Sequence, residues 1–545
     1  MHVSSLTGFT TRSSALATFA VGRMGGWLAL DVRAAAGTSH YAQAVGIYQR
    51  ERSGLGGDKG SLAAPLLYNR CVLNNSDLEF RAGFTYVVGD LLAVGARYAP
   101  AVLYPLFLTP AEYGIYAIAT AISTVMGVLV IFGLKGAAFK QSFDYDDVEG
   151  RRRFYGSLWL FITLGGAVVI LFVHYLWGHF FPNILGTVPF DPYIRLAIWA
   201  AYLNGFGIIL YEIYRAESKA GLYVTFSLAN AFTLVFLAFF FVAVFKQRLL
   251  GALTAPVISG LIWAMVYSLV LIPHMKLDFD WAKVKKALAY GLPLIPHQIG
   301  HWMLNLSDRV ILEGRVPLAD LGAYGFGYNV GNVEQVIANA GNSALMPSYG
   351  KAPKDAAKRK ALPDLFANYV AWTAAAALAI SIFVDELISA FMPAGFQQAI
   401  GIVPWVALGF FCVSLYYGPM NVITLLAGET RWVWLFTLVA GAVNIGANLL
   451  LVPKFGIQAA AVNTLLGYFT LFALVYWYGR RFNGPAYAWK RIAAICATLV
   501  LGILADRWFV PSDLWLEWLA DLGILGGYAW LCIPYFRHGN KEARE

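Results

Sequence analysis

Charged side chains are scarce in this 545-residue sequence. Only 13% of the residues are charged and 59% are hydrophobic, and the mean hydropathy is +0.61. Soluble globular chains carry about 25% charged residues. The shortage excludes a soluble domain and predicts an all-α protein that crosses a membrane many times. The formal net charge of +9 therefore indicates basic cytoplasmic loops, not a nucleic-acid partner.

Cysteine and long hydrophilic loops are scarce as well. The four cysteines are scattered without metal-ligand or redox spacing, so we expect no metal site, no disulfide framework and no cofactor. The stretch "GLGGDKGS" at 54–61 has Lys-Gly-Ser where a phosphate loop has Gly-Lys-Ser/Thr. No nucleophile–base pair is evident, and every loop is too short for an extramembrane catalytic domain. We therefore expect that the protein is not an enzyme.

Apolar windows of about 20 residues, the length that crosses a bilayer, recur from Gly83 onward. Lysine and arginine gather in alternate loops, which predicts an even number of spans with both ends of the bundle cytoplasmic. We predict about fourteen spans, near 83–107, 113–134, 154–180, 194–214, 222–245, 249–273, 288–312, 318–346, 364–384, 400–427, 432–452, 456–479, 490–509 and 515–536.

Residues 1–80 do not fit this pattern. The stretch "SSALATFAVG" is too short to cross a membrane, and it lacks the cleavage site of a signal peptide. We expect a disordered N-terminal extension, or a start that has been placed too early. The predicted organisation is then an extension at 1–80, a six-span lobe at 81–275, a second six-span lobe at 276–480, and two further spans with a cytoplasmic tail at 481–545.

The two lobes show an internal repeat. "LTPAEYGIYAIATAIST" at 108–124 matches "VPLADLGAYGFGYNVGN" at 316–332, and in both a short loop runs into a span. The matched pairs are Glu112 with Asp320, Gly114 with Gly322, and Tyr116 with Tyr324. Because each half holds an even number of spans, the repeats are parallel and related by an axis along the membrane normal.

Polar side chains share single helix faces inside the predicted seventh and eighth spans. Groups of this kind avoid lipid and face the bundle interior or a wet cavity. In the seventh span these residues are His297, His301, Asn305 and Asp308, with Arg309 at the edge. In the eighth span they lie three or four residues apart: Tyr324, Tyr328, Asn332, Gln335, Asn339 and Asn342.

The first lobe carries a milder version of both features. Asp90 and Arg97 are seven residues apart on one face of the first span, and the positions equivalent to the eighth-span stripe are Tyr116, Thr120, Thr124 and Gly127. Two readings of such stripes are open, a substrate pathway or hydrogen bonds that join helices. The histidine pair has metal spacing without a third ligand, so protonation or plain polar lining is the expected role.

The stretches "YGLPLIPHQIGHWMLNLSDRVIL" and "LGAYGFGYNVGN" resemble the bacterial polysaccharide-transporter family, the flippases of O-antigen, exopolysaccharide and capsule repeat units. That family is related to the MATE drug exporters and the peptidoglycan lipid flippases. The resemblance covers roughly 82 to 480. The matching motifs are Leu292-Pro293 opening the seventh span, Ser307-Asp308-Arg309 near its end, and Gly322 and Tyr324 opening the eighth.

The resemblance implies a V-shaped MATE-like pair of six-helix lobes in the bacterial inner membrane. Such proteins carry an undecaprenyl-diphosphate-linked oligosaccharide from the cytoplasmic to the periplasmic leaflet by alternating access. Expected partners are this polyprenyl-linked cargo, membrane lipid, and a polymerase and other export proteins. Arg97 and Arg309 are the predicted diphosphate ligands, the eighth-span stripe the predicted sugar ligands, and Asp90, Asp308, His297 and His301 the predicted ion-coupling groups.

Two other cargoes remain open. One is a cationic drug, carried by a MATE-type antiporter, and the other is the peptidoglycan lipid precursor. The first needs an acidic cavity, whereas each candidate acid here accompanies an arginine.

Overall fold

The computed structural model describes residues 20–24, 27–31, 89, 92–180, 185–354, 356–509 and 514–542. Two units, Met1–Leu78 and Glu79–Glu545, are described separately. In the first unit β1 (Ala20–Met24) pairs antiparallel with β2 (Trp27–Asp31), and Ala20 lies opposite Asp31. The remainder of the predicted N-terminal extension lies outside the described residues.

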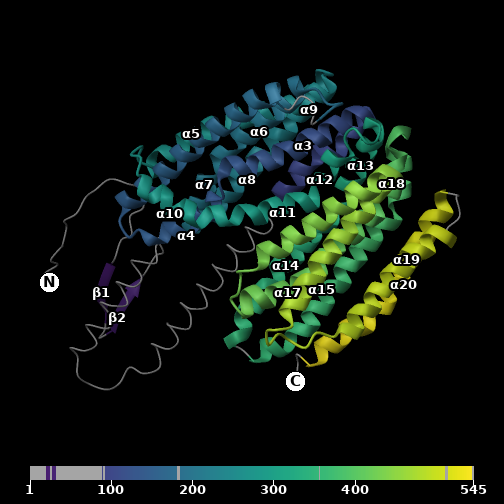
Figure 1. Cartoon of the computed structure of the whole chain (residues 1–545). Helices are drawn as coiled ribbons and strands as arrows, with labels where there is room; N and C mark the ends of the chain where they lie inside the picture. Colours follow the sequence, from purple (N-terminus) through teal and green to yellow (C-terminus); the bar gives the residue numbers. More distant parts are fainter. Residues whose placement is uncertain are drawn as a thin grey trace. The chain divides into compact units, whose positions relative to one another are not determined.

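The first half of the second unit is helical (Figure 1). Residues 92–103 form its first described helix. The elements that follow are η1 (Tyr104–Leu106), α3 (Pro110–Ile131), α4 (Leu134–Lys140), η2 (Gln141–Asp144), α5 (Val148–Phe180), η3 (Phe190–Ile194), α6 (Arg195–Asn204), η4 (Gly205–Gly207), α7 (Ile208–Ala216), α8 (Ala220–Phe239), η5 (Phe240–Val244), α9 (Arg248–Leu271) and η6 (Ile272–His274).

The second half of the unit is helical as well. Its elements are α10 (Trp281–Gly291), η7 (Leu292–Leu294), α11 (Ile295–Asn305), α12 (Ser307–Leu312), α13 (Leu318–Gly331), α14 (Val333–Lys351), η8 (Ala352–Lys354), α15 (Ala356–Ile382), α16 (Val384–Phe391), η9 (Ala394–Gly401), α17 (Val403–Asn421), η10 (Val422–Leu426) and α18 (Val433–Gly479). Two C-terminal helices, α19 (Trp489–Phe509) and α20 (Leu514–Glu542), pack against α15 and against each other (Figure 1).

The predicted all-α polytopic class is confirmed for this unit. Eight helices of the described chain are long and apolar enough to cross a membrane. They lie at Pro110–Ile131, Val148–Trp177, Phe190–Ala216, Ala220–Val244, Arg248–His274, Ala357–Ile382, Val403–Leu426 and Val433–Gly479. The last has 47 residues and contains two predicted spans, which meet at a bend where Gly456 adopts φ 60° and ψ −140°. The predicted number of fourteen spans is not confirmed.

The predicted seventh and eighth spans are not continuous helices, contrary to expectation. The seventh is interrupted by the short helix around Pro293 and again at Leu306, which has φ −137° and ψ −15°. The eighth is interrupted at Asn332, between α13 and α14. Hydropathy alone misses such breaks because it does not report backbone conformation. In membrane proteins, broken helices are tolerated where protein or a cavity surrounds them.

Glycines bring the two halves together at both ends of α3. Gly114 on α3 faces the equivalent Gly322 on α13, and a Cβ on Gly322 would overlap the carbonyl oxygen of Pro110. At the other end, Gly133 and Gly291 meet, so that α4 packs against α10. Small residues permit this backbone approach between helices in membranes. The contacts fix the α3–α13 crossing that positions the candidate site.

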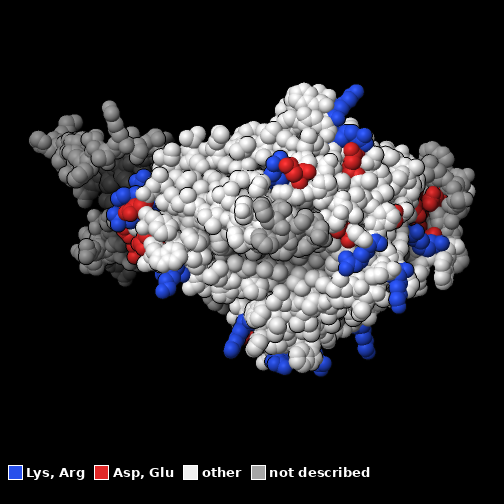
Figure 2. All heavy atoms as spheres, turned by 45° about the horizontal axis from the view of Figure 1, so that its top comes forward, with Lys and Arg blue, Asp and Glu red and all other residues white. Residues whose placement is uncertain are grey.

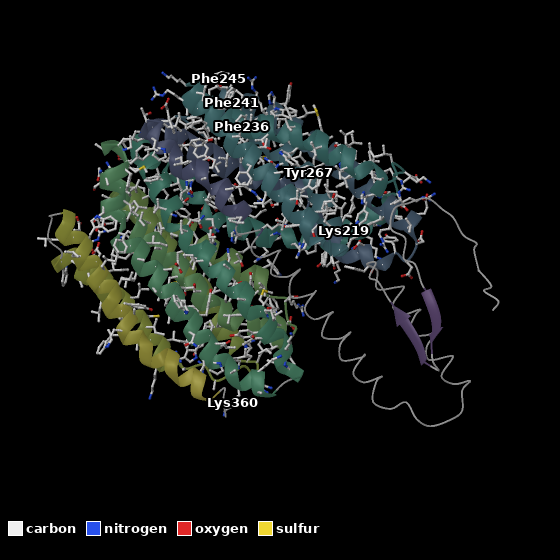
Figure 3. All side chains as sticks on the ribbon, turned by 180° about the vertical axis from the view of Figure 1, so that it is seen from behind. Lys219, Phe236, Phe241, Phe245, Tyr267 and Lys360 are labelled. Atoms are coloured by element: carbon white, nitrogen blue, oxygen red, sulfur yellow. The ribbon has the colours of Figure 1, made fainter. Side chains whose placement is uncertain are left out.

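The surface of the unit suits a hydrocarbon environment. Figure 2 shows charged side chains in separate small groups on an otherwise uncharged face. Figure 3 shows Phe236, Phe241 and Phe245 toward one end of the α8–η5 segment and Lys219 at the other. Phe236 and Phe245 are 63% and 54% exposed. Such exposure is expected where lipid covers the apolar side chains of a polytopic protein.

Candidate functional site

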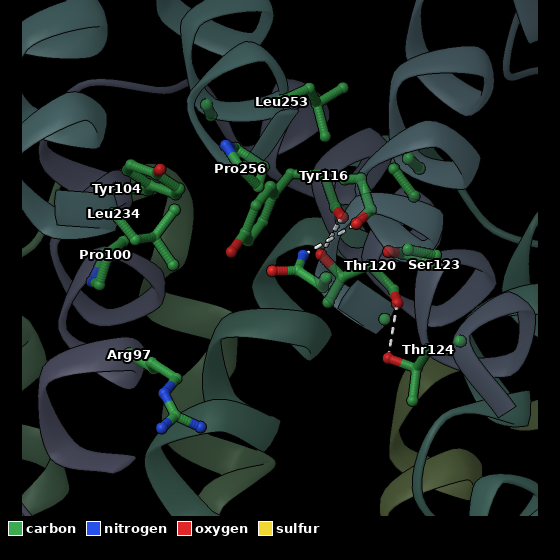
Figure 4. Close-up of a pocket in the computed structure, with 18 of the residues that line it drawn as sticks. Arg97, Pro100, Tyr104, Tyr116, Thr120, Ser123, Thr124, Leu234, Leu253 and Pro256 are labelled. Carbon is green, nitrogen blue, oxygen red and sulfur yellow. Dashed lines mark hydrogen bonds between the residues drawn. The ribbon is translucent and has the colours of Figure 1, made fainter. Parts of the chain in front are cut away.

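The first half of the unit contains a cavity of about 280 Å³. Its walls come from the helix at 92–103 and from α3, α6, α8 and α9 (Figure 4). Most lining residues are alanine, glycine, proline or aliphatic side chains. The polar ones are Arg97, Tyr104, Tyr116, Thr120, Ser123, Thr124 and Asn204. Among the described residues that line the cavity, there is one cation and no carboxylate.

Arg97 supplies that cation. Its side chain is exposed, and Nη2 donates a hydrogen bond of 2.7 Å to Ser227 Oγ on α8. This bond orients the guanidinium and leaves most of its five N–H donors available. Figure 4 shows Arg97 across the cavity from Thr120 and Thr124. Asp90, the predicted companion of Arg97, lies outside the described residues.

The wall opposite Arg97 presents hydroxyl groups. Thr120 donates to the Tyr116 carbonyl at 2.8 Å, and Thr124 donates to the Thr120 carbonyl at 2.9 Å. Because each threonine has used its own hydrogen on the helix backbone, its oxygen faces the cavity as an acceptor. The first-repeat face predicted from the sequence, which includes Tyr116 and Gly127, thus lines this cavity.

The Asp308–Arg309 pair lies elsewhere, buried in the second half. Asp308 is 1% exposed and Arg309 is 2% exposed. Arg309 Nη1 lies 3.2 Å from an Asp308 oxygen and donates to the Asn305 carbonyl at 2.8 Å. Its guanidinium carbon stacks 4.3 Å from the centre of the Tyr328 ring, and the Tyr324 hydroxyl donates to Asp308. Both charges are therefore satisfied by protein in this conformation.

The remaining seventh-span residues extend this network instead of forming one continuous face. Asn305 and Asp308 lie on either side of the break at Leu306. Asn305 accepts a hydrogen bond of 2.7 Å from the Tyr468 hydroxyl and lies 3.2 Å from a ring nitrogen of His301. His297 lies 3.1 Å from the Thr437 hydroxyl. No group of three His, Cys, Asp or Glu side chains among the described residues is arranged to hold a metal ion.

The eighth-span stripe mostly joins helices. Asn332 donates to the Tyr98 hydroxyl at 2.7 Å, and Asn421 donates to Asn342 at 2.8 Å. The Tyr417 hydroxyl donates to Asn339. Gln335, half-buried, lies on the same helix as Asn339 and Asn342. Since none of the six stripe residues lines the cavity around Arg97, their substrate contacts stay predictions.

Sequence reasoning missed several residues near these sites. Ser123 and Asn204 line the cavity, and Ser227 orients Arg97. A small hydroxyl residue in an apolar helix is too common to stand out. Glu334, fully buried within the eighth-span stripe, was also missed. In the sequence, Glu334 is a single acidic residue between Asn332 and Gln335. It was overlooked because the regular spacing of the amide residues defined the predicted stripe.

Comparisons with known proteins agree with this architecture. The model of a family described as "Polysaccharide biosynthesis protein" matches residues 81–352. A search of the curated proteins finds no match. The solved structure of the lipid II flippase MurJ in an inward closed conformation is similar, with a TM-score of 0.65 and 13% identity over 83% of this chain and 99% of that one.

MATE transporters share the fold more distantly. An inward-facing multidrug resistance MATE family transporter of the MOP superfamily has a TM-score of 0.52 and 14% identity, over 76% of this chain and 96% of its own. A mutant of the Vibrio cholerae MATE transporter VcmN has a TM-score of 0.50 and 14% identity, over 74% and 96%. At these identities the likeness establishes the fold.

The solved structures that share this fold are a flippase and transporters. The chain is therefore a multi-pass membrane protein whose residues 81–352 match the polysaccharide biosynthesis protein family, and it shares its fold with the flippase MurJ and the MATE transporters.

Proposed function

We propose that this flippase carries a polyprenyl-diphosphate-linked oligosaccharide from the cytoplasmic to the periplasmic leaflet of the bacterial inner membrane. The cavity around Arg97 is the observation that supports the proposal most strongly. It joins one guanidinium to a wall of hydroxyl acceptors, and its described lining contains no carboxylate. A cationic drug would have no negatively charged partner in this cavity. A sugar phosphate would have a guanidinium for its phosphate and hydroxyl oxygens for its sugar.

Arg97 is proposed to hold the diphosphate. A guanidinium binds phosphate oxygens through paired hydrogen bonds that a lysine does not reproduce. The bond to Ser227 positions the group before the cargo arrives. Sugar hydroxyls then donate to Thr120 and Thr124 on the facing wall. The polyprenyl tail stays in lipid, and no covalent bond is made or broken.

The size of the cavity indicates how the cargo enters. Its volume of about 280 Å³ is just below the ~300–1,000 Å³ typical of ligand pockets. We therefore expect the two halves to part before a whole repeat unit is admitted. Outward movement of an anion is favoured by an inside-negative potential, by ~2.3 kcal/mol per charge per 100 mV.

The test uses a strain that lacks the gene, complemented with the wild-type protein or with variants. Wild type should restore surface polymer. Arg97→Ala should leave lipid-linked repeat units in the inner membrane and lower polymer export roughly ten- to hundred-fold, since a charged hydrogen bond contributes ~1.5–3 kcal/mol. Arg97→Lys should restore export only in part.

Arg248→Ala is the matched control. Arg248 is another arginine of the first half, but it is paired with Glu112 at 2.8 Å and does not line the cavity. Export at the wild-type level in the Arg97→Ala strain, with normal protein in the membrane, would reject the diphosphate site. Absence of repeat units in the deletion strain would reject the flippase function.

A peptidoglycan lipid flippase is the second candidate. The fold likeness to MurJ over 83% of this chain supports it. The two cargoes share a diphosphate and a polyprenyl tail, so the cavity suits both. Rescue of a strain depleted of its own lipid II flippase would favour this candidate, whereas rescue of surface polymer alone would favour the first.

A further inference from the structure

Glu334 stands apart from the other buried acids of this membrane unit. Its side chain has no exposed surface, and neither carboxyl oxygen has a hydrogen-bond partner among the described residues. Other buried acids have partners: Asp308 has Arg309, and Glu212 has Arg215 at 3.1 Å. Glu386 and Asp521 also lack donors, but they lie close enough to interact with each other.

A buried carboxylate without a partner is costly. Moving an ionised carboxyl from water to an apolar environment is so unfavourable that the group takes up a proton instead. Tyr369 of α15 lies within electrostatic range of Glu334, and its hydroxyl donates to the Ala338 carbonyl at 2.9 Å. On α17, Tyr417 donates to Asn339. Across α13, Arg309 is occupied by Asp308 and Tyr328. None of these groups supplies a counter-charge.

The position of Glu334 is as informative as its burial. It lies two residues beyond Asn332, where α13 ends and α14 begins, near the midpoint of the pair that runs from Leu318 to Lys351. Before the break, Asn329 donates to the Tyr113 hydroxyl at 2.8 Å and Asn332 donates to the Tyr98 hydroxyl at 2.7 Å. These bonds join α13 to the first half of the unit.

Beyond the break, the contacts belong to the second half. Asn342 and Asn339 bond to α17 residues, and α14 packs along α15 and α17. α13 packs against α3 of the first half and also against η9 and α17 of the second half, whereas the described packing of α14 lies within the second half. The interruption at Asn332 therefore separates the segment that contacts both halves from one that is packed in the second, and Glu334 is buried just beyond it.

We propose that Glu334 is a proton-binding site that couples movement of the two halves to the proton gradient. Its neutral form favours the closed packing of α14 against α15 and α17. Release of the proton leaves a carboxylate that needs water, which favours a conformation in which the helices separate. Only the O–H bond forms and breaks, and the proton is exchanged with water on either side of the membrane. Lower pH therefore increases the population of the closed packing.

The proposal rests on the proposed flippase function for its purpose, but proton binding can be measured without cargo. The full-length protein is reconstituted in lipid nanodiscs, and infrared difference spectra are recorded across pH. Wild type should show the carbonyl stretch of a protonated carboxyl, which shifts in deuterated water. Glu334→Gln should lose this band, and Glu334→Asp should retain it at a shifted position. Glu212→Gln, which alters a buried but paired acid, should keep it.

Polymer export in the deletion strain completes the test. Glu334→Gln should lower export at least tenfold, and Glu334→Asp should recover part of it. If the Glu334→Gln protein keeps the whole band, or exports as wild type does, proton coupling through Glu334 is refuted while the flippase function stands. If the band depends on Glu334 but wild type restores no polymer, the proton site stands and the proposed cargo is wrong.

Discussion

The two repeats use equivalent helix faces in opposite ways. In the first, Tyr116, Thr120, Thr124 and Gly127 line an open cavity on α3. In the second, three of the four matching positions on α13 and α14 hold larger polar side chains, and Tyr324 and Tyr328 contact the buried Asp308–Arg309 pair. Small side chains leave room for a ligand, whereas large ones find partners within the protein. The more polar repeat is therefore the more structural one.

The arginines illustrate this difference. Arg309 has a carboxylate, a carbonyl and an aromatic ring as partners, and it is 2% exposed. Arg97 is exposed and has one described hydrogen bond, to a serine. A guanidinium whose donors are used within the protein stabilises the fold. A guanidinium beside a cavity that still has unused donors can bind cargo. Each of the following experiments tests whether the two halves really divide these tasks.

The largest effect is expected in the second repeat. Arg309→Ala should lower the free energy of unfolding by ~3–5 kcal/mol, because it leaves Asp308 buried without its partner. The measurement is thermal unfolding of the purified protein in detergent. The double variant Arg309→Met with Asp308→Asn should recover part of the loss. If the Arg309→Ala protein is as stable as the wild type but fails in export, Arg309 contacts the cargo. The proposed division between a cargo-binding first half and a structural second half would then be wrong.

The next effect concerns the contact between the repeats. Gly322→Val should overlap the Pro110 carbonyl and destabilise the closed α3–α13 crossing, with ~1–3 kcal/mol of overpacking. Crosslinking between the ends of α3 and α13 should fall, while protein levels stay measurable. Gly350→Val is the control, since a Cβ there would meet no atom within 4 Å. Unchanged crosslinking in the Gly322 variant would mean that the halves do not close at this point.

A smaller effect is expected from the cavity wall. Thr124→Val keeps the shape but removes an acceptor, so export should fall roughly three- to tenfold, in keeping with ~0.5–1.5 kcal/mol for a hydrogen bond. Thermal stability should be nearly unchanged. Thr498→Val on α19 is matched, because Thr498 also donates to its own helix, at 2.9 Å to Ala494. Equal export by both variants would argue against a sugar contact at Thr124.

The smallest effect compares the starts of α3 and α13. Thr109 and Glu112 form a capping box on α3, whereas α13 follows Pro317 without a side-chain cap. Thr109→Ala should lower stability by ~1 kcal/mol. Asp320→Asn, at the position that matches Glu112, should change it by only a few tenths. Thermal unfolding of the two variants would measure this, and equal losses would show that the caps do not differ.

Much of the fold could be predicted from the sequence because lipid imposes a length and a composition on each span. Seven of the predicted spans, such as 222–245, correspond to apolar helical segments of membrane length, and two more meet within α18. The predicted spans at 490–509 and 515–536 correspond to the helices α19 and α20. The breaks at Leu306 and Asn332 could not be predicted, since they depend on tertiary contacts. Leu306 itself is an ordinary apolar residue in an apolar window.

The candidate site was predicted in part. Arg97 and the first-repeat face emerged from charge and helical spacing. The location of the cavity did not, because a sequence shows which side chains are polar but not which of them satisfy one another. Tyr328 and Asn332 belong to the eighth-span stripe, which is a more regular polar pattern than the first-repeat face. Their partners, Arg309 and Tyr98, are nevertheless known only from the fold.

The meeting of Gly114 and Gly322 bears on the origin of the chain. A residue that touches its own repeat equivalent lies beside the pseudo-twofold axis. In a symmetric dimer of half-length chains, the same glycine would touch itself, as residues on the axis of an isologous interface do. A single substitution in such an ancestor would enter the interface twice. In a single polypeptide the two positions are independent, so the second half can hold a buried ion pair while the first half lines an open cavity.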